Sequence, residues 1–121
     1  AHVIARSVAN DALGRLYRSA KIVLNDHWPT MAARGFVSNR LFDVAMAQGF
    51  VISDFFEGAD IFQGYVPLVR NGAELAEAIA FFECRPTERQ RCTSAVFEIV
   101  RHRHTFADRA RRVLEVVRER I

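Results

Sequence analysis

The chain has little of what marks secreted, membrane-spanning and disulfide-stabilised proteins. Its 121 residues include two cysteines, Cys84 and Cys92, and no uninterrupted apolar run long enough to cross a membrane. The first six residues lack the charged-then-apolar order of a secretory signal. These absences predict a soluble, cytoplasmic protein without a membrane span, in which reduced cysteines serve packing.

Lysine is nearly absent, and the positive charge is unevenly distributed. Lys21 is the single lysine, while residues 85–121 contain ten arginines and five acids, a surplus larger than the net charge of +3 for the whole chain. Such an arginine-rich end suits nucleic acid, anionic lipid or an acidic partner domain, but solvated helix faces carry arginine routinely. Because no aromatic platform alternates with these arginines, we predict no nucleic-acid binding.

Metal-binding patterns are also missing from the sequence. There is no Asp-x-Asp triplet, and the pair His102 and His104 has no third ligand at a suitable spacing. We therefore expect neither a metal ion nor another cofactor.

Half of the residues are apolar, which suits one globular domain over residues 1–121 with a modest core. Short apolar strands alternate with helical patterns and are followed by a run of helices. The predicted strands cover residues 21–25, 50–53 and 65–69, and the predicted helices cover residues 12–19, 39–48, 73–83 and two segments after Pro86 and Thr105. This order predicts an α/β fold, a three-layer Rossmann-like parallel sheet with C-terminal helices.

Local signals predict where several helices begin. Asn10 and Asp11 are expected to cap the first helix, and Pro29 to keep its own segment out of a helix. Thr105, with Asp108 three residues later, has the pattern of a capping box at the start of the last helix. Apolar residues recur there at helical spacing: Phe106, Ala110, Val113, Leu114, Val117 and Ile121. This periodicity predicts a buried stripe on the last helix.

The segment from Gly35 to Asp43 has the pattern of a nucleotide site. A loop that starts with glycine and enters a helix presents free backbone N–H groups and the positive end of the helix dipole, both suited to a diphosphate. Asp43, three positions after Arg40, lies on the same side of the helix and can accept hydrogen bonds from ribose hydroxyls. The candidate binding residues of this segment are Gly35, Phe36, Ser38, Asn39, Arg40 and Asp43. The same pattern also suits an ordinary capped helix, in which Asp43 pairs with Arg40 or with a backbone amide.

A polar loop follows the first predicted strand, at residues 25–29. In doubly wound sheets this carboxyl end of a strand is the side where ligands bind, so His27 and Trp28 are candidates to line the cleft. In the alternative interpretation, Trp28 caps the edge of the core and His27 is a solvated loop residue.

Residues 13–106 resemble the carboxyl-terminal donor-binding domain of group-one glycosyltransferases with the GT-B architecture. The resemblance rests on residues 16–25, 51–54 and 57–58 and on the motif Ser38-Asn39-Arg40-Leu41-Phe42-Asp43, whose order and spacing fit together. It is nearest to the CgeB-like branch. The resemblance implies that Asp43 holds the ribose of the donor nucleotide, while Ser38, Asn39 and Arg40 face its diphosphate.

Two positions depart from the pattern of these glycosyltransferases. Many relatives have a glutamate that contacts the donor sugar eight positions before the ribose acid, where this chain has Gly35. The sequence therefore does not determine the identity of the transferred sugar. Gln48 replaces a glycine that usually ends the helix, and we expect the neighbouring Gly49 to supply the left-handed conformation.

The resemblance also implies a partner domain. A GT-B enzyme has an N-terminal acceptor-binding domain and further strands that this chain does not contain. Any general base on that domain would be missing as well. We therefore expect a nucleotide-diphosphate sugar as ligand and no turnover by the isolated domain.

Two other functions also suit an α/β chain of this length. A phosphoacceptor receiver domain needs an acidic pair after the first strand and a downstream lysine, which this chain lacks. A non-catalytic module that binds a nucleotide sugar or docks another domain remains compatible with every pattern above.

Overall fold

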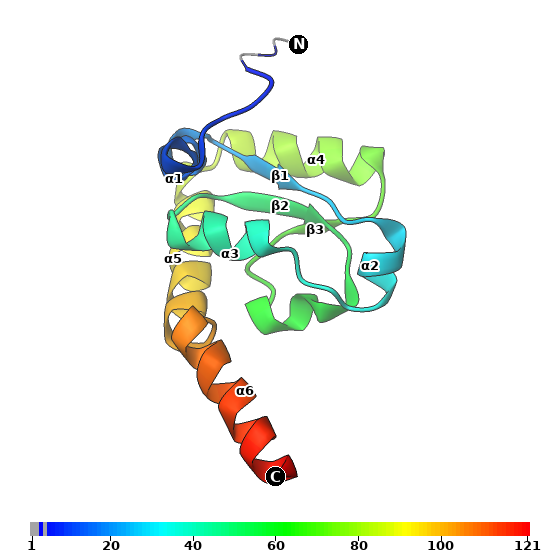
Figure 1. Cartoon of the computed structure of the whole chain (residues 1–121). Coiled ribbons are helices and arrows are strands. Elements are labelled where there is room, and N and C mark those ends of the chain that lie inside the picture. Colours follow the sequence, from blue (N-terminus) through cyan, green and yellow to red (C-terminus); the bar gives the residue numbers. More distant parts are fainter. Residues whose placement is uncertain (1–2, 4) are drawn as a thin grey trace.

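A computed structural model describes residue 3 and residues 5–121, and it contains a sheet of three parallel strands (Figure 1). The strands are β1 (Val23–Asn25), β2 (Val51–Asp54) and β3 (Leu68–Val69), and they lie in the order β1-β2-β3. Asn25 lies opposite Ser53, and Asp54 lies opposite Val69. The carboxyl ends of all three strands therefore meet at one edge, as the predicted parallel sheet requires.

In the described residues, six α-helices and one 3₁₀ helix surround or extend the sheet. They are α1 (Asn10–Ser19), α2 (Pro29–Ala33), α3 (Asn39–Met46), η1 (Glu57–Phe62), α4 (Gly72–Glu83), α5 (Pro86–Arg103) and α6 (Phe106–Arg120). This mixed α/β architecture with C-terminal helices confirms the predicted fold class.

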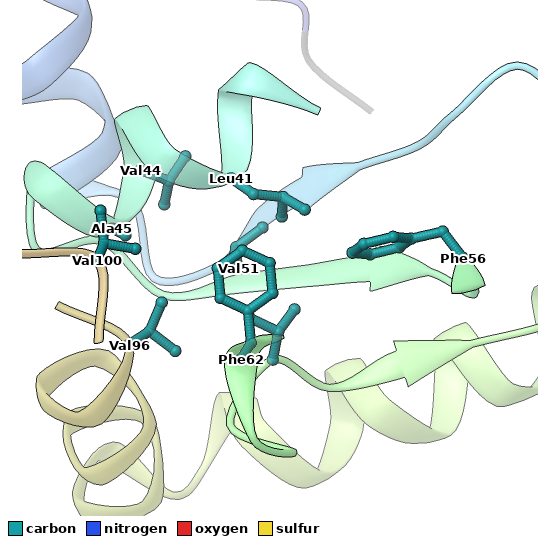
Figure 2. Close-up of a cluster of buried hydrophobic side chains, with 9 residues drawn as sticks. Leu41, Val44, Ala45, Val51, Phe56, Phe62, Val96 and Val100 are labelled. Atoms are coloured by element: carbon teal, nitrogen blue, oxygen red, sulfur yellow. The ribbon is translucent and has the colours of Figure 1, made fainter. Parts of the chain in front are cut away.

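Two apolar clusters lie on opposite faces of the sheet and form its layers. Side chains of α3, η1 and α5 pack with Val51 on one face (Figure 2). Ile52, the next residue of β2, faces the other way with Phe50 and Cys92, against which α4 packs. Alternate residues of a strand point to opposite faces, so β2 is buried on both sides. The predicted packing role is confirmed for Cys92, of which only 5% of the surface is exposed, and was wrong for Cys84, which is exposed at the end of α4.

Several predicted helix starts and ends were wrong. α1 begins at Asn10 after Ala9, without a side-chain cap. Pro29 does not prevent a helix: it begins α2, because the first helical position needs no backbone N–H donor. After α3, Gln48 itself adopts the left-handed conformation, at a φ of 60°. Gly49 is needed for another reason, because a Cβ there would lie 2.6 Å from the carbonyl oxygen of Tyr17.

The third strand is shorter than predicted. The N–H of Tyr65 donates to the carbonyl of Phe62 and closes a turn, so the strand covers only Leu68–Val69. The carbonyl oxygen of Pro67 still accepts a hydrogen bond from Ser53 of β2. Proline fits here because β3 lies at the border of the described sheet, as expected.

The last helix differs most from its prediction. α6 extends away from the sheet, as Figure 1 shows, and none of its side chains is buried. Phe106 is 91% exposed and Ile121 is 99% exposed. The predicted buried stripe is therefore exposed, because no described element covers it along most of its length. Its start was predicted correctly, since Thr105 and Asp108 form the capping box.

Two predictions, the absence of a membrane span and the absence of a secretory signal, can be compared with the described residues. Among the described residues, no helix is both long enough and apolar enough to cross a bilayer. The absence of a secretory signal concerns residues 1–6, of which Ala1, His2 and Ile4 lie outside the described residues.

Candidate functional site

His27 lies at the carboxyl edge of the sheet and is fixed on both ring nitrogens. Its side chain has no exposed surface. Nδ1 lies 2.6 Å from Oδ1 of Asp54, and the backbone N–H of His27 donates to Oδ2 of the same carboxylate at 2.8 Å. On the other side of the ring, the backbone N–H of Ser38 donates to Nε2 at 3.1 Å. His27 thus joins the end of β2 to the residue that precedes α3.

The alternative interpretation of this loop was wrong for both of its residues. His27 is buried rather than solvated, and Trp28 is 76% exposed rather than placed at the edge of the core. Sequence alone does not distinguish the two, because a polar ring is buried only where partners satisfy its nitrogens.

The polar contacts continue from Asp54 into the sheet. The Ser53 hydroxyl donates to Oδ1 of Asp54 at 3.1 Å, and the Asn25 amide donates to the Ser53 hydroxyl oxygen, also at 3.1 Å. Asn25 and Ser53 are buried, and the Asn25 Oδ1 atom has no hydrogen-bond partner in the described residues. The side chains of four residues and the backbone N–H groups of His27 and Ser38 therefore form a continuous network at the ends of β1 and β2.

The amino end of α3 is partly satisfied by the protein itself. Ser38 is the N-cap residue, and its hydroxyl oxygen accepts a hydrogen bond from the N–H of Arg40 at 3.3 Å. The N–H groups of Ser38 and Arg40, two of the donors expected to face an anion, thus already have partners inside the chain. Such contacts are the usual function of an N-cap.

Asn39 and Asp43 line a pocket on the side of α3 that faces the junction of α5 and α6. The pocket has a volume of about 340 Å³. Its remaining lining residues are Phe42, Met46, His104, Thr105, Phe106 and Arg109. In the part of the chain that the structure describes, the Asp43 carboxylate has no side-chain or backbone donor as partner, so it does not pair with Arg40. An exposed acid, an amide and a guanidinium therefore share one pocket.

The aromatic rings of the pocket hold its basic groups in place. The guanidinium of Arg109 lies 4.6 Å from the ring centroid of Phe42, within the range of a cation–π contact. The His104 ring lies 5.9 Å from the same ring. Burial, and secondly the charge of Arg109, lower the pKa of His104. This lowering of the pKa favours the neutral form of His104, whereas Arg109 contributes a cation to the pocket.

The seven predicted site residues do not lie in one place. Asn39 and Asp43 line the pocket, whereas Ser38 and His27 belong to the buried network. Of the others, Phe36 is 47% exposed and Arg40 is exposed at the start of α3.

Gly35 packs against η1 instead of lining either place. It has a φ of 69°, and a Cβ on Gly58 would lie 2.5 Å from its carbonyl oxygen. Gly58 is therefore needed for this close backbone approach, whereas Gly35 is favoured by its left-handed φ.

Sequence reasoning missed the contribution of His104 and Arg109. Both belong to the arginine-rich end, whose arginines were interpreted as belonging to solvated helix faces. The capping box at Thr105 gave one signal, because it marks a break between two helices next to these residues. It did not indicate that this break lies against α3.

No metal site forms from the histidines and acids of the described residues, since no three such side chains, or cysteines, gather closely enough to bind an ion. His102 instead contacts the exposed Glu98 at 2.9 Å. What the pocket offers a ligand is therefore hydrogen-bond acceptors, one cation and apolar rings.

Comparison with known proteins identifies a family. Residues 2–115 match the model of a family described as glycosyl transferase-like. No curated protein and no solved structure matches the chain.

Proposed function

Because this chain belongs to the glycosyl transferase-like family, we propose that it is the part of a glycosyltransferase that binds a nucleotide-diphosphate sugar. Within that family we assign it to the GT-B architecture and its CgeB-like branch. An N-terminal domain outside these residues would bind the acceptor and supply any general base.

The observation that carries the proposal is the unpartnered Asp43 carboxylate in a pocket with a cation. Two adjacent hydroxyls of a ribose can donate to its two oxygens, as hydroxyls do to an ionised carboxylate. Arg109, which is held against Phe42, supplies the positive charge that a diphosphate needs. The exposed ring of Phe106 at the same pocket provides an apolar face for the base.

The other predicted residues act around this pocket in the proposal. Asn39 begins α3 and lines the pocket, so its amide groups face the diphosphate. Arg40 is exposed next to it and adds a second cation. Gly35, Phe36, Ser38 and His27 shape the loop that leads to α3.

In this proposal the chemistry is sugar transfer with charge stabilisation by protein groups. As the bond between the sugar and the diphosphate breaks, negative charge develops on the leaving diphosphate. Arg109 and the amino end of α3 stabilise that charge, because fixed donors and cations lower the energy of a developing anion. The isolated domain binds the donor without transferring its sugar.

A calorimetric titration tests the binding. Uridine, guanosine and thymidine diphosphates and their sugars are titrated into the wild type, Asp43→Asn and Arg109→Gln. Loss of a charged hydrogen bond weakens binding by roughly tenfold or more. Asp60→Asn is the matched control, because Asp60 is an exposed acid on η1 outside the pocket. Equal affinities of the wild type and Asp43→Asn would contradict the proposed site.

The non-catalytic alternative differs only in turnover. It is favoured by the exposed apolar stripe of α6, which suits docking to another domain. Sugar transfer measured after an N-terminal acceptor domain is supplied distinguishes the two. Donor binding without any transfer or donor hydrolysis would support the module.

A further inference from the structure

The hydrogen-bond network around His27 has only one chemically consistent direction. The Ser38 N–H can only donate, so Nε2 of His27 must accept. Nδ1 therefore carries the ring proton and donates to the Asp54 carboxylate, which can only accept. The Ser53 hydroxyl also donates to that carboxylate, which leaves its oxygen free to accept from the Asn25 amide.

We propose that His27, as the neutral imidazole with its proton on Nδ1, is a positioning residue that fixes the amino end of α3 relative to the ends of β1 and β2. The effect on donor binding rests on the proposed function, whereas the effect on α3 itself does not.

The surroundings of the ring support a fixed orientation. Its side chain is fully buried and lies beside Phe56, with ring centroids 4.6 Å apart, and Phe56 is 1% exposed. Rotation of the imidazole would break contacts with the core, remove the only ring donor to Asp54 and leave the Ser38 N–H without its acceptor. The backbone N–H of His27 also binds Asp54, so the loop and the ring are fixed together.

The rest of α3 is held mainly by apolar packing, which depends little on the exact orientation of the groups in contact. Leu41, Val44 and Ala45 are buried in the apolar cluster and determine which face of the helix points inward. Apolar packing alone tolerates small shifts along a helix axis, whereas a hydrogen bond requires a defined distance and angle. The bond from Ser38 to His27 therefore sets where α3 begins.

This position matters for the pocket because its residues follow directly. Asn39 is the next residue after Ser38, and Asp43 lies about one turn further along the helix. A shift of the amino end would move both side chains relative to Arg109, which comes from another helix. His27 thus acts on the pocket through α3, without lining it.

Imidazole nitrogen resonances of the wild type give the first test. The proposal expects a protonated Nδ1 and an unprotonated Nε2 for His27 at pH 7. A proton on Nε2, either in the other tautomer or in the imidazolium, would overturn it, because two donors would then face each other at Ser38.

Two substitutions of His27 separate its two bonds. His27→Asn places an amide donor near Nδ1 but has no group at the place of Nε2, so it loses the bond to Ser38. His27→Gln can place an acceptor near Nε2 and keep that bond. We expect faster amide hydrogen exchange at the start of α3 in His27→Asn and partial recovery in His27→Gln. Equal exchange in the wild type and His27→Asn would overturn the proposal.

A second pair of variants leaves His27 in place, in case its replacement prevents folding. Ser38 has a φ of −59°, which proline also adopts, so Ser38→Pro removes the N–H donor in a compatible conformation. Ser38→Ala is the control, because both variants lose the hydroxyl cap but only Ser38→Pro loses the N–H. Nucleoside diphosphates should bind Ser38→Pro about 2- to 10-fold more weakly than Ser38→Ala, as expected for one lost hydrogen bond.

The outcomes separate this inference from the proposed function. If the wild type binds no nucleoside diphosphate, the proposed function fails, and the tautomer and exchange measurements still decide whether His27 positions α3. If binding occurs but is equal in Ser38→Pro and Ser38→Ala, the proposed function stands and the positioning role is overturned.

Discussion

Helices α3 and α6 begin in the same way but end in different surroundings. Each has a side-chain N-cap, Ser38 for α3 and Thr105 for α6, and each has apolar residues at helical spacing. Three side chains of α3 are buried, whereas α6 has no buried side chain. Local signals start a helix, but only an opposing surface buries its stripe. The comparison teaches that these two properties are independent in this chain.

The same contrast holds for their polar ends. The residue that caps α3 is tied to the end of β2 through His27. The cap of α6 is closed on itself, since Thr105 and Asp108 bond each other and Arg111 adds one exposed ion pair. We therefore expect changes near α3 to affect the whole domain and changes in α6 to stay local.

The test with the largest expected effect replaces a phenylalanine by alanine once in the apolar cluster around α3 and once in α6. Phe62 is fully buried in the cluster that includes α3, and Phe106 at the start of α6 is 91% exposed. Phe62→Ala should lower the free energy of unfolding by about 3–5 kcal/mol, because it removes buried contacts and leaves a cavity. Phe106→Ala should change it by less than about 0.5 kcal/mol.

Urea unfolding followed by far-ultraviolet circular dichroism measures both values. A loss for Phe106→Ala comparable to that for Phe62→Ala would break the comparison. It would mean that α6 packs against another surface in solution.

A test with a smaller expected effect removes the cap of a helix that packs on the sheet, α4, and the cap of the exposed helix α6. Asn71 caps α4, which packs on the sheet, and its side chain accepts a hydrogen bond from the N–H of Glu74 at 2.9 Å. Asn71→Ala should destabilise the domain by about 1 kcal/mol, the usual effect of a lost cap. Thr105→Ala removes a similar bond from α6, where it should increase fraying without changing global unfolding. Amide hydrogen exchange in α6, together with urea unfolding, distinguishes the two responses.

These outcomes would refine the comparison in different ways. If Thr105→Ala lowers global stability as much as Asn71→Ala does, then the start of α6 contributes to the core through the pocket beside α3. Unchanged exchange in α6 would show that its cap does not hold the helix.

The sequence predicted the parts of the fold that depend on local chemistry or on apolar runs. The strand predicted at residues 50–53 forms at Val51–Asp54, and the capping box at Thr105 was predicted correctly. The predicted burial of α6 was wrong, because the helical spacing of its apolar residues identifies one face of the helix but does not show whether another element covers that face. Pro29 was misjudged because its effect depends on whether it begins a helix or interrupts one.

The candidate site was harder to predict because its parts come from distant segments. Asn39 and Asp43 were identified from their place at a helix start, and both line the pocket. Arg109 was not, since the turn that carries it against Phe42 is a tertiary contact. The burial of His27 depends on partners 27 and 11 residues away, Asp54 and Ser38. No spacing rule predicts such contacts.

The smallest test concerns protonation at the start of α6. Hydrogen bonds from the Thr105 hydroxyl and then from the Thr105 N–H lower the pKa of Asp108, with Arg111 adding less. Because the folded pKa lies below that of the unfolded chain, Asp108 stabilises this helix start above the ordinary aspartate pKa. That contribution is lost as the pH falls through the lowered pKa of Asp108.

Carboxyl carbon resonances should give a pKa for Asp108 that rises more in Thr105→Val than in Arg111→Gln. A larger rise in Arg111→Gln would mean that the exposed ion pair, rather than the capping box, holds the start of α6. The contrast with the buried anchoring of α3 would then become sharper, because α6 would begin on a contact that salt screens.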